Sequence, residues 1–296
     1  MPHRTLTVGN AQVTALCDVV GDLPVSLDLA FPGVERQAWA PYRRRYPEVF
    51  SGADRWRLRD HCFVVRAGGW VALVDTGVGD AWAPGARWIG ASGRLPQELA
   101  GAGVDPGEVD LVILTHLHLD HVGWNLAWED DQPQPRFPNA RYLIQRADWE
   151  RFSREGDDND RDAFERCVRP LQTLGLVELI VGDHVVDAEL TVLHTPGHTP
   201  GSQSLLVASG EDVVLLWGDV ANHPAQVSEP AWCSSGDLEP EVARRTREAL
   251  LDRVEAEGMW LAPSHFPEPF GSVVRVDARR GWSPHRPRAA GDPPGG

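Results

Sequence analysis

The sequence is poor in cysteine, has no excess of basic residues and contains no long apolar run, and each shortage argues against a class of protein. Its four cysteines lie far apart without a C-x-x-C pair, which leaves a zinc ribbon or redox motif unsupported and favours free thiols in a reducing compartment. The 28 basic and 43 acidic residues give a net charge of −15, which argues against a nucleic-acid partner. Neither a membrane-spanning run nor the apolar core of a signal peptide is present. We therefore expect a soluble, cytoplasmic protein that binds neither nucleic acid nor membrane.

Strand-like runs alternate with helical segments along the chain. With 296 residues, of which 42% are hydrophobic, the chain is long enough to bury a full core. Helix start and stop signals predict helices over 95–103, 148–154, 160–174 and 240–258. β-Branched content and flanking turn residues predict strands over 4–20 (two strands turned at Gly9-Asn10), 61–67, 70–75, 110–114, 140–145, 177–181, 190–193, 205–208, 213–216, 260–262 and 272–276.

Three segments depart from this pattern. Residues 21–60 hold prolines with aromatic residues between them, and we expect an irregular insertion with short helices that acts as a lid, a substrate wall or a dimer contact, or only covers the core. Residues 129–139 are acidic and proline-rich, which predicts a loop. The tail over 279–296 is rich in proline, glycine and arginine, which predicts disorder. We therefore expect a single domain over residues 1–278.

The stretch from Thr115 to His121 concentrates the chemistry of the chain. Its residues His116, His118, Asp120 and His121 put three imidazoles and one carboxylate within six residues, directly after an apolar strand. Histidine and aspartate bind zinc and other divalent first-row metals. His116 and His118 are two residues apart and therefore face the same side of an extended segment, whereas two adjacent ligands must point differently. The stretch therefore predicts a metal site.

Three later residues share this context. His198, Asp219 and His265 each follow an apolar strand and lie in a loop marked by glycine or proline. Together with the first four they make seven candidate ligands, more than one tetrahedral zinc can use. Seven ligands suit two metals roughly 3.5–4 Å apart that share one carboxylate and one water.

The motifs occur in an order that resembles the metallo-β-lactamase superfamily. They are Asp75-Thr76-Gly77 at a strand end, H-x-H-x-D-H at His116–His121, T-P-G-H-T-P-G-S at Thr195–Ser202, Gly218-Asp219 and Ser264-His265. The resemblance covers residues 61–276 and implies an α/β (α+β) fold, an αββα sandwich of two facing mixed sheets with the site at one edge. It implies a first metal held by His116, His118 and His198, a second held by Asp120, His121 and His265, and Asp219 as the bridge. Asp75 would orient a ligand histidine from behind, or cap its turn.

The complete ligand set resembles the binuclear hydrolases and departs from true zinc β-lactamases, which lack an aspartate at the bridging position. Two divalent cations, expected to be zinc with manganese, iron or cobalt as alternatives, would acidify a shared water and give a bridging hydroxide nucleophile. Asp120 would act as the catalytic residue that accepts a hydrogen bond from this hydroxide and assists protonation of the leaving group. The resemblance thus implies an enzyme, a hydrolase of a lactone or another carboxylic ester.

Three short segments resemble the lactonase and methyl-parathion-hydrolase-like branch of this superfamily. They are Gly123-Trp124-Asn125, the segment 137–142 and His265-Phe266-Pro267. Lactonases of that branch carry a tyrosine three residues after the bridging aspartate, and here that position is Asn222, which cannot act as a phenolic acid. We expect Trp124, Asn222 and Phe266 to line the substrate pocket. Phosphotriester hydrolysis, a thioesterase of the glyoxalase II type and a non-catalytic metal scaffold remain alternatives, and a homodimer is plausible.

Overall fold

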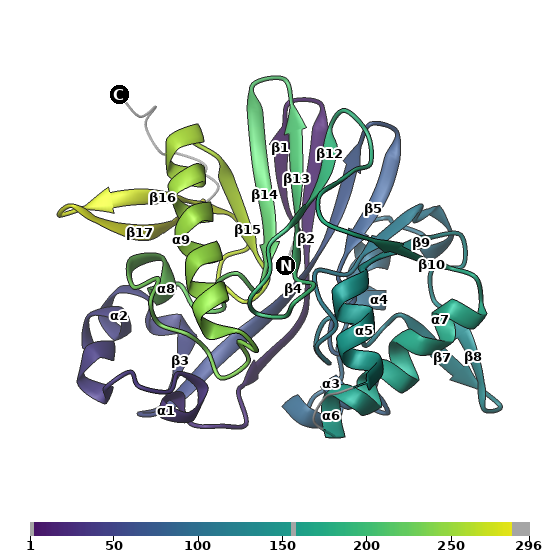
Figure 1. Ribbon diagram of the computed structural model, residues 1–296, viewed down its shortest axis with the longest axis horizontal. Coiled ribbons are helices and arrows are strands. Elements are labelled where there is room, and N and C mark those ends of the chain that lie inside the picture. The colour runs from purple at the N-terminus through teal and green to yellow at the C-terminus, as the bar shows by residue number, and fades with distance from the viewer. Residues whose placement is uncertain (1–2, 155–157, 286–296) are drawn as a thin grey trace.

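Two β-sheets face each other at the centre of the molecule, and each is built by one half of the chain (Figure 1). The computed structural model describes residues 3–154 and 158–285. The first sheet has the order β1-β2-β4-β5-β6-β9-β10, with β3 beside β4, and is formed by Arg4–Val8, Ala11–Asp22, Arg55–Ala67, Trp70–Val74, Leu111–Ile113, Arg141–Gln145, Val177–Ile180 and Phe50–Ser51 (β3). The second runs from β11 to β17 in sequence order and is formed by His184–Val185, Leu190–His194, Gln203–Ser209, Asp212–Gly218, Trp260–Pro263, Gly271–Val276 and Arg279–Pro284. Both sheets contain parallel and antiparallel pairs, so both are mixed.

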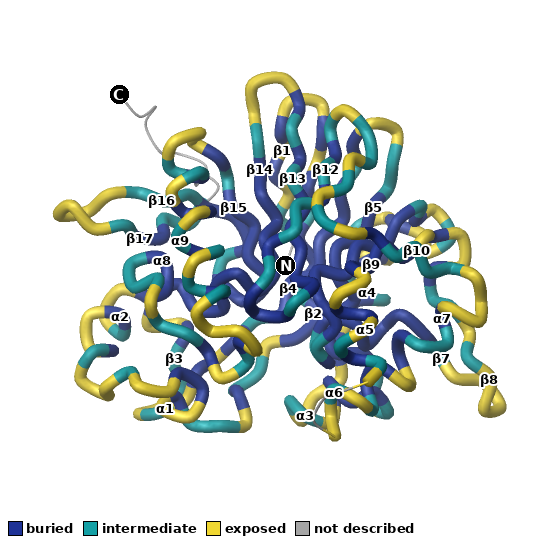
Figure 2. The backbone as a smooth tube through the Cα atoms, in the orientation of Figure 1, coloured by how far each residue is buried: buried dark blue, intermediate teal, exposed yellow. Residues whose placement is uncertain are grey.

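The alternation of side chains along the strands produces the layers. In β4, Phe63 and Val65 join the core between the two sheets, whereas Cys62 and Val64 face the opposite side and join the core under the helices. The buried stretches concentrate on the central strands, and the exposed ones on the outer loops (Figure 2). The chain therefore buries both faces of its sheets.

Helices cover the outer face of each sheet. Leu95 and Leu99 of α4 (Leu95–Gly101) share one apolar cluster with the first sheet, together with residues of α5 (Arg146–Arg154), α6 (Asp158–Ala163), the π-helix η4 (Phe164–Val168) and α7 (Arg169–Thr173). The second sheet is covered by α9 (Pro240–Glu257), which begins with proline and ends before Gly258 in the left-handed region. Shorter helices are α3 (Pro84–Ile89), η3 (Pro106–Glu108) and α8 (Ala225–Ser228). This arrangement confirms the αββα sandwich.

The segment 21–60 is irregular at its centre and regular at both ends. Strand β2 continues to Asp22 and β4 begins at Arg55, so the two strands are longer than predicted. Between them lie strand β3, which was not predicted, and four short helices, as expected: α1 (Leu27–Ala30), η1 (Arg36–Trp39), α2 (Ala40–Arg45) and η2 (Pro47–Val49). Its aromatic side chains, apart from the half-buried Phe50, are buried in the apolar cluster that also contains residues of β14 and α9. The segment is therefore packed onto the body of the molecule.

The loop prediction for 129–139 was wrong in part. Leu126–Glu129 and Gln132–Pro135 form a hairpin, β7 and β8. The two residues between the strands, Asp130 and Asp131, have φ angles of 49° and 60°, which a tight two-residue hairpin turn requires. The acidic, proline-rich sequence of this segment is typical of a loop and did not predict these strands. The hairpin pairs with neither of the two large sheets.

The disorder predicted from residue 279 was wrong for the first part of the tail. Arg279–Pro284 forms β17, which pairs with β16 along its whole length. Trp282 is buried against Phe266, and its main chain exchanges hydrogen bonds with the hydroxyl of Tyr46. The buried Trp282 thus keeps residues 279–284 ordered despite their polar composition. Residues 286–296 lie outside the described part of the chain.

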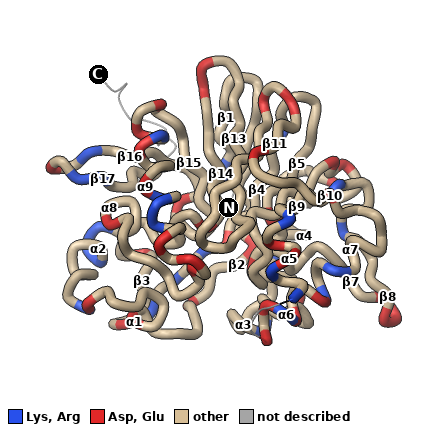
Figure 3. Tube along the Cα trace, in the orientation of Figure 1, with Lys and Arg blue, Asp and Glu red and all other residues tan. Residues whose placement is uncertain are grey.

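Charged residues are distributed around the periphery. Acidic and basic segments are interspersed on the helices and outer loops (Figure 3). Within residues 3–154 and 158–285, no helix is both long and apolar enough to cross a bilayer.

Candidate metal centre

The loops that carry the seven candidate ligands meet at one edge of the sandwich. β5 and β6 are parallel, as are β14 and β15, so the carboxyl ends of each pair lie together. Hydrogen bonds join the sheets at this edge: the main-chain N–H of Gln203 donates to the Thr115 carbonyl over 2.8 Å, and that of His61 to the Ser264 carbonyl over 2.9 Å. Residues from both halves of the chain are thereby fixed to one another beside the site.

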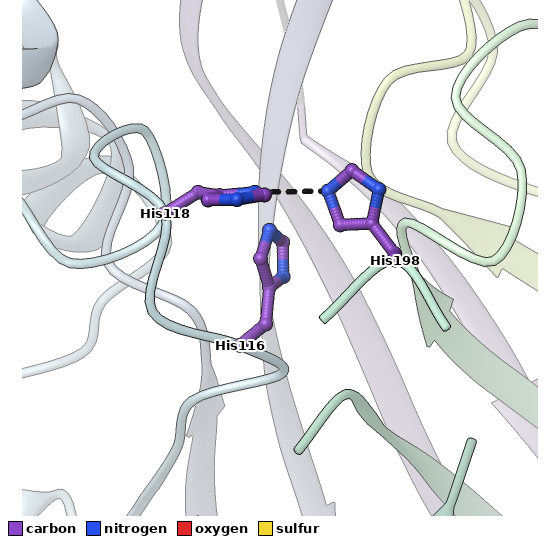
Figure 4. A group of neighbouring side chains, drawn as sticks. All are labelled: His116, His118 and His198. Atoms are coloured by element: carbon purple, nitrogen blue, oxygen red, sulfur yellow. Dashed lines mark hydrogen bonds between the residues drawn. The ribbon is translucent and has the colours of Figure 1, made fainter. Parts of the chain in front are cut away.

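His116, His118 and His198 form the first group (Figure 4). Their three ring centroids lie 4.7 Å from one another, and Nδ1 of His118 lies 2.9 Å from Nε2 of His198. Three imidazoles that point at one spot are suited to hold a divalent cation. This is the first trio that the sequence predicted.

Asp120, His121 and His265 form the second group. The carboxylate oxygens of Asp120 lie 3.8 Å from Nε2 of His121 and 3.7 Å from Nε2 of His265. The adjacent residues 120 and 121 reach the same spot from one loop, and His265 closes the group from the second sheet. This is the second predicted trio.

Asp219 lies between the groups and turns one oxygen toward each. Its Oδ2 is 3.3 Å from Nε2 of His198 and 4.0 Å from Nε2 of His116. Its Oδ1 is 3.6 Å from Nε2 of His121 and 3.1 Å from Nε2 of His265. The preceding Gly218 has a φ of 56°, and a Cβ there would lie 2.8 Å from that of Thr115, so glycine is needed to bring Asp219 into this position. Asp219 thus has the geometry of the predicted bridge.

The donor atoms fit two cations. Nε2 of His116, Nε2 of His121 and Oδ1 of Asp219 are buried without a hydrogen-bond partner among the described residues. The other ring nitrogen, Nδ1, of four histidines is held from behind: that of His116 by Thr115 Oγ1, His121 by Asp75, His198 by Asp237 and His265 by the Arg59 carbonyl. Each of these contacts fixes the ring so that Nε2 faces the centre, as in metal-ligating histidines.

The electrostatics of the site favour positive charge. Burial lowers the pKa of His265, but the carboxylates of Asp219 and Asp120 outweigh it and raise this pKa to about 9. Burial likewise raises the pKa of Asp219, yet His265 and His121 hold it well below its usual range. The positive charge of bound divalent cations would stabilise these buried carboxylates in the same way.

Asp75 contacts a candidate ligand histidine, which is one of the two roles considered for it. One of its oxygens accepts from the main-chain N–H of Thr115 over 2.7 Å, and the other accepts from Thr115 Oγ1 and from Nδ1 of His121. It therefore holds both the start of the ligand loop and the ring of His121.

Two further carboxylates support the site, and sequence reasoning missed both. Asp237 accepts from Nδ1 of His198 over 2.8 Å and is itself paired with the fully buried Arg247. Asp148 accepts from Thr199 Oγ1 and from the Gly201 N–H, and burial raises its pKa to about 6 although these two bonds lower it. Both lie outside the recognised motifs. The only local signal is Gly236, which stands before Asp237 and where a Cβ would lie 3.1 Å from the His198 ring.

Asp60 is a third carboxylate that sequence reasoning missed. It is fully buried, and neither oxygen has a hydrogen-bond partner among the described residues. It lies on the same face of β4 as Trp56 and Leu58, which line the cavity over the metal centre. Burial raises its pKa well above the usual range of aspartate, although His265 and His121 lower it.

A cavity of about 280 Å³ opens onto the ligands. His118, Asp120, His198, Asp219 and His265 form its polar floor. Its apolar walls come partly from the segment 21–60 and consist of Leu23, Val25, Ala30, Trp56, Leu58, Trp88 and Leu119. The segment 21–60 therefore forms a wall of the cavity, one of the roles considered for it.

Of the three predicted pocket residues, only Asn222 lines this cavity. The prediction for Trp124 was wrong because its indole is buried in the core and donates to Asp18 over 2.9 Å. Phe266 is also not among the lining residues, since it is fully buried against Trp217 and Trp282. Asn222 donates from Nδ2 to Oδ2 of Asp219 over 2.5 Å and therefore steadies the bridging carboxylate.

Comparison with known proteins identifies the family of this chain. Residues 56–265 match the metallo-beta-lactamase superfamily. An N-acyl homoserine lactonase of Bacillus sp is 33% identical over 123 residues, 42% of this chain and 42% of that protein. The N-acyl homoserine lactonase AttM of Rhizobium radiobacter is 36% identical over 123 residues, 40% of this chain and 43% of that protein. The chain thus matches less than half the length of these relatives.

Two solved structures share the whole fold. The hydrolase AbOPH in the beta lactamase superfamily has a TM-score of 0.81 at 22% identity, with 97% of this chain and 99% of that chain covered. AidC, a dizinc quorum-quenching lactonase, has a TM-score of 0.81 at 18% identity, with 97% and 98% covered. Since the family match spans most of the chain and includes all seven ligands, this chain belongs to the metallo-beta-lactamase superfamily.

Proposed function

We propose that the protein is a metal-dependent hydrolase that opens a lactone, with other carboxylic esters as poorer substrates. One observation carries the proposal: two three-residue groups of candidate ligands lie on either side of Asp219 at the floor of a cavity that is walled in part by apolar side chains. The similarity to N-acyl homoserine lactonases over 123 residues supports the choice of a lactone. Two divalent cations, for which we propose zinc, would supply an acidified water and an electrophile for the carbonyl oxygen.

The residues of the chain perform the remaining tasks. Asp120 lies at the cavity floor with its carboxylate beside His121 and His265, where it can accept a proton from the attacking water and return it to the leaving alkoxide. The apolar walls hold the substrate's aliphatic part and exclude water from the floor. Asn222 steadies Asp219 and cannot supply a phenolic proton, so protonation of the leaving group falls to Asp120.

A substrate panel tests this proposal. The zinc-reconstituted protein is assayed with γ-butyrolactone, γ-lactones bearing acylamino chains of increasing length, an aryl ester, a glutathione thioester and an aryl phosphotriester. We expect the highest kcat/KM for a lactone with an apolar chain, because only this substrate uses both the floor and the walls. A phosphotriester or thioester that exceeds every lactone would overturn the choice of substrate.

Two variants separate the chemistry from the binding. His118→Ala removes a proposed ligand and is expected to abolish hydrolysis. Leu58→Ala widens the cavity and should mainly raise KM for lactones with long acyl chains. Full metal occupancy without turnover on any substrate of the panel would favour the non-catalytic scaffold.

A further inference from the structure

A second cleft, of about 650 Å³, lies on the other face of β4 from the metal centre. Side chains alternate along a strand, so Trp56 and Leu58 face the metal-site cavity while Arg59 and His61 face this cleft. Its remaining walls come from β2, from the segment before α4 and from Pro267–Pro269, just after the ligand His265. None of the roles assigned above uses this space.

One cation of the cleft has no ionic partner. Arg4 is paired with Glu268, and Arg94 lies 3.7 Å from Glu98, which also binds His3. Within the described ranges, no carboxylate pairs with the Arg59 guanidinium, and no hydrogen bond to it occurs there. A half-buried guanidinium offers planar, two-pronged recognition of a carboxylate.

A buried hydrogen-bond acceptor stands beside it. His61 is 4% exposed, and its Nε2 donates to the Phe266 carbonyl over 3.1 Å. Burial lowers the pKa of this imidazole to about 3, so it is neutral and its Nδ1 carries a lone pair. This Nδ1 has no partner among the described residues, and a buried acceptor of this kind calls for a donor.

From these two features we infer that the cleft binds a small hydroxycarboxylate, its carboxylate on Arg59 and its hydroxyl donating to Nδ1 of His61. The two residues are two positions apart on one strand, so both side chains border the cleft from neighbouring positions. Ala15, Val19 and Pro269 offer apolar surface to the carbon chain of this ligand. The ring-opened form of a simple lactone has these same groups, but the hydrolysis proposed above does not depend on this cleft.

Cys17 gives a readout specific to this cleft. Its partly exposed thiol lines the cleft, whereas Cys62 and Cys167 are buried and Cys233 lies elsewhere. The zinc-loaded full chain is alkylated with iodoacetamide at mildly alkaline pH, because burial raises the pKa of the Cys17 thiol to about 11. Mass spectrometry follows each cysteine with and without millimolar 4-hydroxybutyrate. We expect the ligand to slow alkylation of Cys17 at least threefold and to leave Cys233 unchanged, wherever else it binds.

Variants and a matched anion complete the test. Arg59→Gln should abolish the protection and Arg59→Lys should keep part of it. Arg57→Gln, a control two residues away on the same face, should keep all of it. For each variant, the rate of Cys17 alkylation without ligand is divided by the rate with ligand, since Arg59 also influences the Cys17 pKa. Butyrate, which lacks the hydroxyl, should protect about fivefold less effectively. No protection of Cys17, or equal protection in the folded Arg59→Gln variant, would overturn the inference.

Discussion

Asp75 combines a buried charge with a backbone conformation that few residues adopt. Its φ of 58° lies in the left-handed region, which asparagine adopts at a lower cost than alanine. We expect Asp75→Asn to fold but to bind the second metal about 10–100-fold more weakly, because His121 loses its anionic partner. Asp75→Ala should lose the same affinity and also about 1–2 kcal/mol of stability. Competition with a chromogenic chelator measures the affinity, and urea denaturation the stability. Wild-type affinity in Asp75→Asn would show that the carboxylate does not act through His121.

Substitution of Asp237 tests whether a carboxylate behind a histidine also supports the first metal. It holds His198 from behind and neutralises Arg247. In Asp237→Asn we expect a similar loss of affinity, about 10–100-fold, confined to the metal that we propose His198 holds. The exposed Glu257→Gln serves as the control for loss of one negative charge. Equal loss of both metals, measured by the same chelator competition, would indicate that the substitution disturbs the whole edge and not His198 alone.

At the scale of the element, one buried aromatic side chain attaches β17 to the apolar core. Trp282 is 1% exposed and packs edge-on against Phe266 at a centroid distance of 5.0 Å. Trp282→Ala should therefore cost about 3–5 kcal/mol in the free energy of unfolding, measured in urea. Val276→Ala, at an exposed position of the neighbouring strand, should cost little. A small effect of Trp282→Ala would mean that backbone pairing with β16, and not the indole, holds this strand in place.

An exposed charge cluster joins the same hairpin to α9. Glu255 accepts from Arg275 over 2.8 Å and from Arg280 over 2.9 Å, and these two arginines lower its pKa to about 2. Because the pKa is lower in the folded state, the cluster stabilises the protein above the unfolded value near 4.5 and loses this contribution as the pH falls toward 2. We expect the stability difference between wild type and Glu255→Gln to shrink between about pH 5 and pH 3.5. A difference independent of pH would contradict the assignment.

Most elements could be predicted from local pattern, and the errors share one cause. The runs at 110–114 and 213–216 are apolar enough to identify strands without knowledge of their neighbours, and they are β6 and β14. The β7–β8 hairpin and β17 are polar, and they pair through backbone groups whose partners the sequence does not display. Among site residues, the seven ligands follow strand ends and stand in recognised motifs. Asp237, Asp148 and the orientation of Trp124 depend on tertiary packing, which local sequence does not encode.

For the molecule as a whole, the candidate ligands come from both sheets. The first sheet's half of the chain supplies His116, His118, Asp120 and His121, and the second supplies His198, Asp219 and His265. Removal of metal with a chelator should therefore abolish activity and lower the melting temperature. Ligand present at 100 times its dissociation constant contributes about 2.7 kcal/mol. Differential scanning fluorimetry with zinc add-back measures both the loss and its recovery. An unchanged melting temperature in protein shown to be metal-free would mean that the two sheets hold the site without help.

The division of ligands between two halves of the chain has a consequence for the unfolded state. All four cysteines are free, so no covalent cross-link limits that ensemble. His118 and His198 are 80 residues apart, and Asp120 and His265 are farther apart still. A cation joining either pair would close a loop as long as those that disulfides close, for which chain entropy predicts about 4–5 kcal/mol. Metal supply would then govern the stability of the folded chain as well as its activity.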